Sequence, residues 1–339
     1  NWRVIRRIDL RGQSLSKAEI NRLIPRAKLD VAAAMSAVEP ILEKVRTGNE
    51  ADLIELSKKY DGIAPTSVRV PKSELTKALS ELEPKVREAL EIAAQRIRLV
   101  HNDQIRESKV TDVESGATVT ERWIPVDRVG LYVPGGRAVY PSSVLMNVIP
   151  AQIAKVPSIA VASPPQQDNN GLPNKTILAT CALLGIDEVY VIGGAQAIAL
   201  FAYGMDGVCE KADLVTGPGN IYVAAAKRAL RGVIGIDSEA GPTEIAILAD
   251  ESAIAADVAT DLISQAEHDV IAASVLVTDS LQLADAVESE LKMRVAKTKH
   301  SERIETALSS QQSAIAIVDD IQQGLEVVNA YAAEHLEIQ

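Results

Sequence analysis

Short apolar strands that alternate with helical segments are the feature that most constrains the fold of this chain. Beyond Arg128 the sequence predicts a first series of such strands at 130–133, 158–162, 188–192, 213–215 and 233–236. Strand–helix alternation of this kind is typical of a parallel sheet that carries helices on both faces. This part of the chain is therefore predicted to form a doubly wound sheet.

A second series with the same cadence follows Gly241-Pro242. Its strands are predicted at 245–248, 273–277, 314–318 and 335–338. The fold class is therefore predicted as α/β, with two tandem doubly wound, Rossmann-like parallel-sheet domains. Ligands bind at the carboxyl ends of strands in open sheets of this class, and we expect every candidate residue below to lie at such an end.

The first part of the chain reads as helical. Residues 1–27 are charged and predict an N-terminal helical arm, with Ser16 as the N-cap of a short helix. Further helices are predicted at 31–60 (interrupted by Gly48), 72–82 and 84–106. Alternating β-branched residues around Ser115-Gly116 predict a hairpin within 108–124.

Charge and cysteine content exclude several classes of function. The 339 residues carry 35 Lys and Arg against 46 Asp and Glu, a net charge of −11, which argues against a nucleic acid or an anionic membrane as the partner. The two cysteines, Cys181 and Cys209, form neither a disulfide framework nor a cysteine-based zinc site. The sequence contains no signal peptide and no apolar run that spans a bilayer, so a cytoplasmic protein is expected.

Four glycine-rich loops follow predicted strands. Glycine lets the backbone approach a phosphate or a ribose, and the helix that follows offers free N–H groups to an anion. Taken singly, each loop is better explained as a tight turn; four on one edge favour a nucleotide-sized ligand. No G-x-G-x-x-G fingerprint followed by an acidic residue is present, so a dinucleotide would bind in a non-standard way. The loops lie at 134–137, 193–196, 217–220 and 241–243.

The most site-like stretch is 236–244, which ends in a Gly-Pro turn and presents the hydroxyl of Thr243. It is followed by an apolar pattern at 254–268 that predicts a helix ending in Ser-Gln-Ala-Glu-His. Gln265 and His268 are three residues apart, so on a helix they share one face and can reach one ligand or metal ion.

Four histidines are present, and two of them are candidates. His101 and His300 lie in charged helical surroundings and are expected at the surface. Glu334 and His335 are adjacent and can converge only at an irregular junction, which the sequence predicts where the last helix gives way to the last strand. Such a pair suits proton transfer and the activation of water.

These segments together resemble the histidinol dehydrogenase family. IDSEAGPTE at 236–244 and DLISQAEH at 261–268 are similar to the long signature of that family. The resemblance begins near residue 25 and continues to the end of the sequence. Further matches follow the order of the family: GLYVPGG at 130–136, GGAQAIA at 193–199, GPGNIYV at 217–223 and EHLE at 334–337.

The resemblance implies a zinc- and NAD-dependent homodimer of histidine biosynthesis. Such an enzyme oxidises L-histidinol to L-histidinaldehyde and then to L-histidine, reducing two NAD. Glu334 and His335 would then be the acid–base pair. By the same resemblance, Tyr132, Gln196 and Asn220 would contact NAD, Gln265 and His268 would bind zinc (Zn2+), and Thr243, Gln265, His268, Glu334 and His335 would contact the substrate.

The resemblance also implies a division of the chain. An arm (1–27) would precede a discontinuous first domain (28–128 with 238–339) on the substrate and metal side, and 129–237 would form the NAD domain. Members of the family continue beyond the position of Gln339 with a dimerisation tail that supplies further zinc ligands. A chain without that tail is expected to be incomplete and inactive.

Three other functions stay open on the sequence. A related zinc- and NAD-dependent dehydrogenase could oxidise a different small alcohol. An aldehyde dehydrogenase would use Cys181 or Cys209 as a thiol nucleophile. A non-enzymatic module would bind NAD without turnover.

Overall fold

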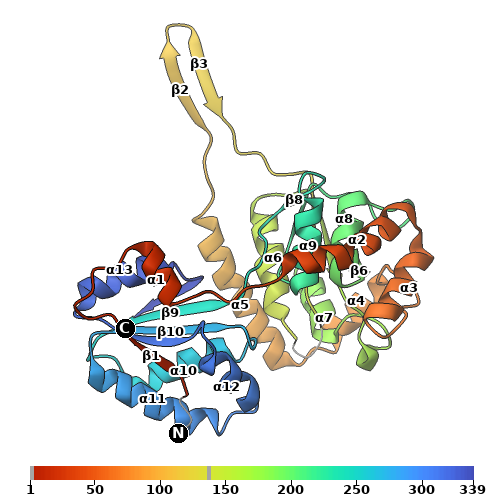
Figure 1. Cartoon of the computed structure of the whole chain (residues 1–339). Coiled ribbons are helices and arrows are strands. Elements are labelled where there is room, and N and C mark those ends of the chain that lie inside the picture. Colours follow the sequence, from red (N-terminus) through yellow and green to blue (C-terminus); the bar gives the residue numbers. More distant parts are fainter. Residues whose placement is uncertain (1–3, 136–138) are drawn as a thin grey trace. The chain divides into compact units, whose positions relative to one another are not determined.

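The computed structural model describes residues 4–135 and 139–339. The chain divides into two compact units, unit 1 (Asn1–Leu29 with Gly241–Gln339) and unit 2 (Asp30–Ala240). Each unit is built on a parallel five-stranded sheet (Figure 1). The predicted α/β class with two Rossmann-like sheets is confirmed.

The sheet of unit 1 has the order β1-β11-β10-β9-β12, and all its strand pairs are parallel. Side chains alternate between its faces, as the period of a strand requires. Along β9, Ile245 and Ile247 pack with α10, α11 and α12, whereas Ala246 and Leu248 pack with α1 and α13. The strands are β1 (Arg6–Asp9), β9 (Glu244–Ala249), β10 (Ala273–Thr278), β11 (Ala314–Ile317) and β12 (His335–Ile338); the helices are α1 (Lys17–Leu23), α10 (Ala255–Ala266), α11 (Leu281–Val295), α12 (Ser301–Ser309) and α13 (Ile321–Tyr331).

The N-terminal residues form part of unit 1, so the prediction of a separate helical arm was incomplete. The predicted helix α1 is present, and Ser16 caps it with Glu19 in a reciprocal capping box. Ahead of it, β1 pairs with β11 as the edge strand of the sheet. Apolar residues of the arm are fully buried in unit 1, among them Val4, Ile5, Leu10 and Ile24.

The sheet of unit 2 has the order β6-β5-β4-β7-β8, again all parallel. Helices α6 and α7 cover one face of it, and α8 and α9 lie on the other with α2 packed against them. Gly130 lies on the α8 side of β4, and a Cβ there would overlap the ring of Phe201, so only glycine fits. The strands are β4 (Arg128–Tyr132), β5 (Ser158–Ser163), β6 (Val189–Val191), β7 (Leu214–Thr216) and β8 (Gly235–Ile236).

The helices of unit 2 are close to those predicted. The interruption at Gly48 separates α2 from α3, and α5 begins at Pro84 in the first turn, where proline is favoured. The helices are α2 (Val31–Thr47), α3 (Glu50–Tyr60), α4 (Lys72–Ser80), α5 (Pro84–Asn102), α6 (Pro141–Ile153), α7 (Lys175–Leu183), α8 (Gly194–Tyr203) and α9 (Ile221–Leu230), with a 3₁₀ turn η1 at Gln167–Asn169.

The predicted domain boundaries need one correction, because residues 30–128 belong with 129–240 rather than with the C-terminal part. Backbone hydrogen bonds are one physical reason. Val70 N donates to Val189 O at 2.9 Å, and Val191 N donates to Val68 O at 2.6 Å, so residues 68–70 line the edge of β6. Helix packing is another, since α4 packs on α7 and α5 on α6.

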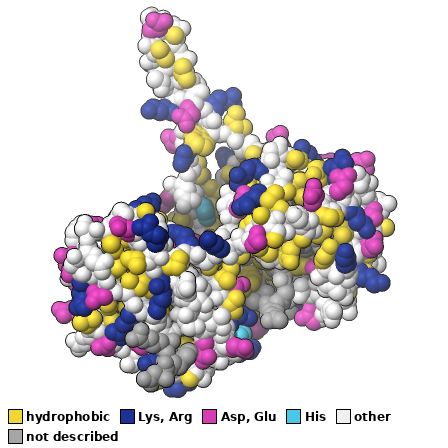
Figure 2. Space-filling view, viewed as in Figure 1, with side chains coloured by type: hydrophobic (Ala, Val, Ile, Leu, Met, Phe, Trp, Pro, Cys, Tyr) yellow, Lys and Arg dark blue, Asp and Glu magenta, His cyan; other side chains and the backbone are white. Residues whose placement is uncertain are grey.

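The hairpin predicted within 108–124 is confirmed as β2 (Lys109–Glu114) and β3 (Ala117–Glu121). Every residue of β2 is exposed, and apolar side chains of the hairpin face solvent (Figure 2). Val110, Val113 and Val119 are each exposed by about 60%. Among the residues that the structure describes, no helix is long and apolar enough to cross a bilayer.

Candidate functional site

The candidate residues of unit 1 gather where β9 and β12 begin. These neighbouring strands are parallel, with His335 opposite Ile245, so Thr243 and Glu334 precede them on the same edge. Helix α10 runs back toward this edge and places Gln265 near its end. The expectation that all candidates lie at carboxyl ends of strands was therefore wrong for unit 1, whose group lies at the amino ends.

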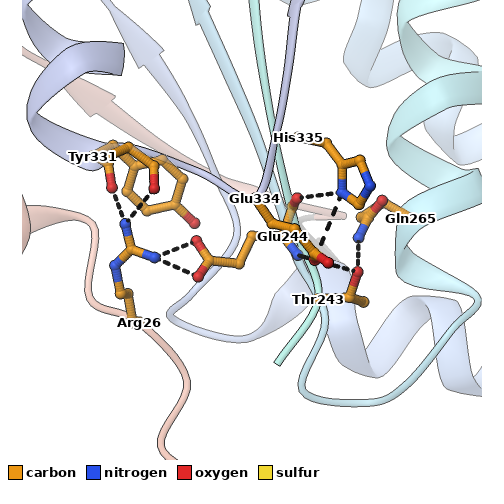
Figure 3. A network of polar contacts seen from close by, with 8 residues as sticks. Arg26, Thr243, Glu244, Gln265, Tyr331, Glu334 and His335 are labelled. Atoms are coloured by element: carbon orange, nitrogen blue, oxygen red, sulfur yellow. Dashed lines mark hydrogen bonds and ion pairs between the residues drawn. The ribbon is translucent and has the colours of Figure 1, made fainter. Parts of the chain in front are cut away.

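A chain of hydrogen bonds joins Gln265, Thr243 and Glu334 (Figure 3). The Gln265 amide donates to the hydroxyl of Thr243, and that hydroxyl donates to Glu334 Oε2 at 2.9 Å. The backbone N–H of Glu244 donates to the same carboxylate oxygen at 3.3 Å. Glu334 Oε2 is thus fixed by two donors, whereas its side chain is half exposed.

The irregular junction predicted before His335 is present. Ala332 ends α13 in the left-handed conformation, with φ of 50°, and β12 starts three residues later. His335 Nδ1 lies 3.1 Å from the carbonyl oxygen of Glu244 and 3.6 Å from Glu334 Oε2. A hydrogen bond from Nδ1 to that carbonyl assigns the proton to Nδ1 and leaves Nε2 free as a base.

Arg26, in the N-terminal segment, stabilises this junction through several contacts. Its guanidinium pairs with the buried carboxylate of Glu244, with one N–O distance of 2.6 Å, and lies 4.8 Å from the ring centre of Tyr331. It also donates to the carbonyl of Tyr331 and, at 3.0 Å, to that of Ala332 (Figure 3). A single cation therefore satisfies the last carbonyls of α13 directly before the Glu334–His335 pair.

Gln265 and His268 are not on one helix, contrary to the prediction, because α10 ends at Ala266. Gln265 is buried, and its amide nitrogen is engaged with Thr243, so its oxygen is the atom available to a metal. His268 is exposed, and its Nδ1 hydrogen-bonds to Ser264 O at 2.9 Å. Its Nε2 is therefore the atom available to a metal ion.

The fit of this pair to zinc is partial. Oxygen and imidazole donors are acceptable to Zn2+, but structural and catalytic sites use three or four protein ligands. Within residues 4–135 and 139–339, no group of three or more His, Cys, Asp or Glu is arranged to hold a metal ion. Gln265 and His268 can therefore supply two donors of a larger set.

The candidate residues of unit 2 lie at the carboxyl edge of its sheet, as predicted. Tyr132 is the last residue of β4, and its hydroxyl accepts the N–H of Gly194 at 3.0 Å, where α8 begins. Burial raises the pKa of Tyr132 to about 12. Gln196 is 2% exposed in the first turn of α8, and its amide nitrogen is a buried donor without a partner among the described residues. Such an orphaned donor beside a helix N-terminus is what an incoming polar ligand would satisfy.

Asn220 has a structural role in the loop after β7. Its side-chain oxygen accepts the N–H groups of Tyr222 and Val223 at 3.0 and 3.2 Å, so it is the N-cap of α9. Gly217 has φ of +126°, and a Cβ there would overlap the carbonyl of Tyr132. The loop is therefore packed directly on the end of β4.

The same loop is held by an ion pair that sequence reasoning missed. Lys227 Nζ is buried and donates to Gly217 O at 2.6 Å and to Asp237 Oδ1 at 2.7 Å. Asp237 Oδ2 accepts the N–H of Gly217 at 2.9 Å. The signal was present in the sequence, since Lys227 interrupts an Ala-rich helix face that is otherwise apolar.

The four glycine-rich loops do not share one edge. Those at 193–196 and 217–220 lie at the carboxyl edge of the unit 2 sheet, as does Gly135. Gly136 and Arg137 of the first loop lie outside the described residues. Gly241 begins the second segment of unit 1, ahead of β9.

Neither cysteine is arranged as a nucleophile. Cys181 is fully buried in α7, and burial raises its pKa to about 12. Burial also raises the pKa of Cys209, although Arg128 Nη2 lies 3.6 Å from its sulfur. A nucleophilic cysteine needs a depressed pKa and access to substrate, so these environments argue against a thiol mechanism. Of the other two histidines, His300 is exposed and His101 is partly buried.

Comparison with known proteins gives a consistent result. A family model described as histidinol dehydrogenase matches residues 24–339. The chain is 63% identical over 335 residues to the histidinol dehydrogenase of Thermobifida fusca, covering 99% of this chain and 76% of that protein. It is 60% identical over 337 residues to the histidinol dehydrogenase of Nocardia farcinica, covering 98% and 76%.

A solved structure agrees with the fold. The crystal structure of histidinol dehydrogenase from Elizabethkingia anophelis matches with a TM-score of 0.90 at 30% identity. The match covers 100% of this chain and 76% of that one.

Proposed function

Because the chain belongs to the histidinol dehydrogenase family, we propose that it oxidises L-histidinol to L-histidine through L-histidinaldehyde, with two NAD as hydride acceptors. The observation that carries the proposal is the fixed Glu334–His335 pair at the start of β12. It offers a carboxylate and an imidazole base in one exposed group, and each step of this oxidation must move a proton.

His335 takes the proton of the alcohol in the first oxidation. Its Nδ1 is engaged with the Glu244 carbonyl at 3.1 Å, so Nε2 is the nitrogen that accepts the hydroxyl proton as the carbon loses hydride. The products of this step are the aldehyde, the reduced cofactor and a protonated imidazole, which returns its proton to solvent.

Glu334 activates water for the second oxidation. Thr243 and the Glu244 N–H hold its Oε2, so Oε1 is the oxygen that accepts a proton from water as the water oxygen attacks the aldehyde. The hydrated aldehyde then loses a second hydride and becomes the carboxylic acid. Thr243 and Gln265 act here as positioning residues for Glu334.

NAD is assigned to the carboxyl edge of unit 2, and the substrate and metal to unit 1. The buried hydroxyl of Tyr132, the orphaned amide of Gln196 and the N-terminus of α9 at Asn220 support the NAD assignment. When bound, NAD supplies the hydride acceptor of both oxidations.

Zinc is assigned to the Oε1 atom of Gln265 and the Nε2 atom of His268, with further ligands outside this pair. When bound, it supplies a Lewis acid that orients the nitrogen-rich substrate. The free atoms left by the bonds to Thr243 and Ser264 support these two ligands.

The exposed valines of hairpin β2–β3 support a homodimer, because an uncovered apolar hairpin is unusual in a monomer. The measured mass of the native protein tests this assignment, and a monomer at micromolar concentration would overturn it. The free buried thiols of Cys181 and Cys209 are compatible with a reducing cytoplasm.

The test is NADH formation from L-histidinol, with two NADH expected for each substrate consumed. His335→Asn is expected to lower the rate by about 10² to 10⁴, the usual contribution of a general base. Glu334→Gln is expected to reduce the second oxidation most, so that added L-histidinaldehyde is no longer consumed. Full activity of both variants would overturn the assignment of this pair.

The same assay separates the alternatives. Turnover of another small alcohol but not of histidinol would place the chain with a related dehydrogenase. NAD binding without any NADH formation would favour a non-enzymatic module.

A further inference from the structure

The carboxyl group of Asp61 belongs to a half-buried residue that the proposed reaction does not use. Asp61 is the C-cap residue of α3 and follows Tyr60, the last residue of that helix. Its Oδ2 is buried and has no hydrogen-bond partner among the described residues. Buried carboxyl oxygens are normally satisfied, so an unpaired one calls for a missing donor.

Asp61 lies close to the carboxyl edge of the unit 2 sheet. A Cβ placed on Gly193, which follows β6, would lie 3.2 Å from Asp61 Oδ1 and 2.6 Å from Pro164 Cβ, which follows β5. A Cβ on Gly62 would lie 3.6 Å from the amide nitrogen of Gln167. The end of α3 therefore packs on the loops that follow β5 and β6.

A cavity of about 510 Å³ opens at this place. Asp61 lines it together with Gly135, which follows β4, and residues of the loop after β5. In doubly wound sheets, ligands bind at this edge, and an acidic residue about twenty positions after the first turn accepts the ribose hydroxyls of a dinucleotide. Here β5 ends at Ser163 and is followed by Pro164 and Pro165, none of which is an acid.

We propose that Asp61 binds the ribose diol of the adenosine half of NAD, in place of the missing acid at the end of β5. The inference rests on the proposed placement of NAD at this edge of unit 2. The two hydroxyls of the diol are donors, and a carboxylate has two oxygens that accept them. The same carboxylate would face the 2′-phosphate of NADP with like charge, so Asp61 also selects NAD over NADP.

The pKa of the Asp61 carboxyl is consistent with this role. Burial raises the pKa of Asp61 to about 6, and its Oδ2 has no hydrogen-bond partner among residues 4–135 and 139–339. Donors from a bound diol favour the ionised carboxylate, so cofactor binding is expected to promote ionisation of Asp61.

The experiment is equilibrium titration of the unchanged chain with NAD and with NADP at pH 8, followed by intrinsic fluorescence or calorimetry. Asp61→Asn is expected to weaken NAD binding at least tenfold and to leave NADP binding unchanged or tighter. Asp168→Asn is the matched control, since it removes the same charge from an exposed position on the same cavity. Its NAD affinity is expected to change less than threefold.

The variant Gln196→Ala tests the placement of NAD at this edge separately from the role of Asp61. If Gln196→Ala weakens NAD binding but Asp61→Asn does not, the cofactor edge stands and the role of Asp61 is overturned. If neither variant changes the affinity, or the unchanged chain does not bind NAD, the cofactor assignment and this inference are both overturned. If Asp168→Asn weakens NAD binding more than Asp61→Asn does, the role of Asp61 is overturned and the ribose diol is assigned to Asp168.

Discussion

The buried ammonium of Lys227 pairs with the solvent-facing carboxylate of Asp237, 2.7 Å between Nζ and Oδ1, and the two side chains hold the loop after β7 from both sides. Lys227 contacts the carbonyl of Gly217, and Asp237 contacts its N–H. The pair therefore sets the path of the backbone that leads into the N-terminus of α9, where we place NAD.

Lys227→Met is expected to destabilise the protein by about 2 kcal/mol, because the Gly217 carbonyl and the Asp237 carboxylate lose their charged donor. It is also expected to weaken NAD binding, since the loop loses its anchor. Urea unfolding and NAD titration measure the two effects. Arg231→Met is the control, because Arg231 is an exposed cation that pairs with Glu239. Equal losses in both variants would contradict a specific role for the Lys227–Asp237 pair.

Gly217→Ala tests the contact between this loop and β4. The new Cβ would overlap the carbonyl of Tyr132 in a backbone conformation that disfavours side chains, so a loss above about 2 kcal/mol is expected. Gly232→Ala is the matched control, with φ of +97° and open space around the Cβ position. Its loss is expected to be about 1 kcal/mol, from conformational strain alone. Thermal unfolding compares the two, and similar melting temperatures would contradict the steric account.

Arg26→Ala is expected to lower both stability and turnover. Glu244 would lose its cation in a buried position, and the carbonyls before the Glu334–His335 pair would lose their donor. We expect a loss of about 1–2 kcal/mol in the free energy of unfolding, since Arg26 is partly exposed.

The kinetic signature of Arg26→Ala should be a lower kcat for histidinol with little change in the affinity for NAD. Arg22→Ala serves as the control, because Arg22 is exposed on α1. An unchanged kcat in Arg26→Ala would show that the junction keeps its geometry without the guanidinium.

The pH dependence of NAD binding follows from Asp61. Its pKa in the folded chain is raised from 3.8 to about 6. NAD affinity is therefore expected to rise with pH through about 6 in the unchanged chain and to stay flat in Asp61→Asn. A flat profile in both would contradict ionisation of Asp61 on binding.

Stability should show the opposite trend. A carboxyl whose folded pKa is raised stabilises the folded chain below its unfolded pKa, and this contribution is lost as pH rises from about 4 through about 6. Asn cannot ionise, so the Asp61→Asn variant does not lose this stability as pH rises. At pH 8 its free energy of unfolding should therefore exceed that of the unchanged chain, by at most about 3 kcal/mol. Urea titrations at pH 4 and 8 measure the difference.

Most strands and helices could be predicted because their patterns are local. The apolar runs of β4 to β12 appear in the sequence at nearly their observed bounds, and helices were expected between them, with bounds given only for 254–268. Strand β1 could not be predicted, since its residues are mainly charged and its stability depends on pairing with β11. Arg7, for instance, pairs with Asp285 and Glu288 of α11, far along the chain.

The composition of the site was predicted better than its geometry. Thr243, Gln265, Glu334 and His335 do lie in one region, but at the amino ends of their strands, which no local pattern reveals. Supporting residues such as Arg26 and Asp61 were missed because isolated charged residues near helix ends are common at protein surfaces. Only tertiary packing shows that the partner of Arg26, Glu244, is buried and that Asp61 Oδ2 is itself a buried atom.

The insertion of unit 2 between the two segments of unit 1 has a consequence for biosynthesis. Residues 30–240 are contiguous and can fold as soon as they leave the ribosome. The first 29 residues cannot do so, because β1 finds its partner strand only when residues 314–317 have been made. The newly made chain therefore carries an unpaired N-terminal strand, with Val4, Ile5 and Leu10 uncovered, until residues 314–317 have been made. A chaperone that holds exposed apolar segments would find its binding site there.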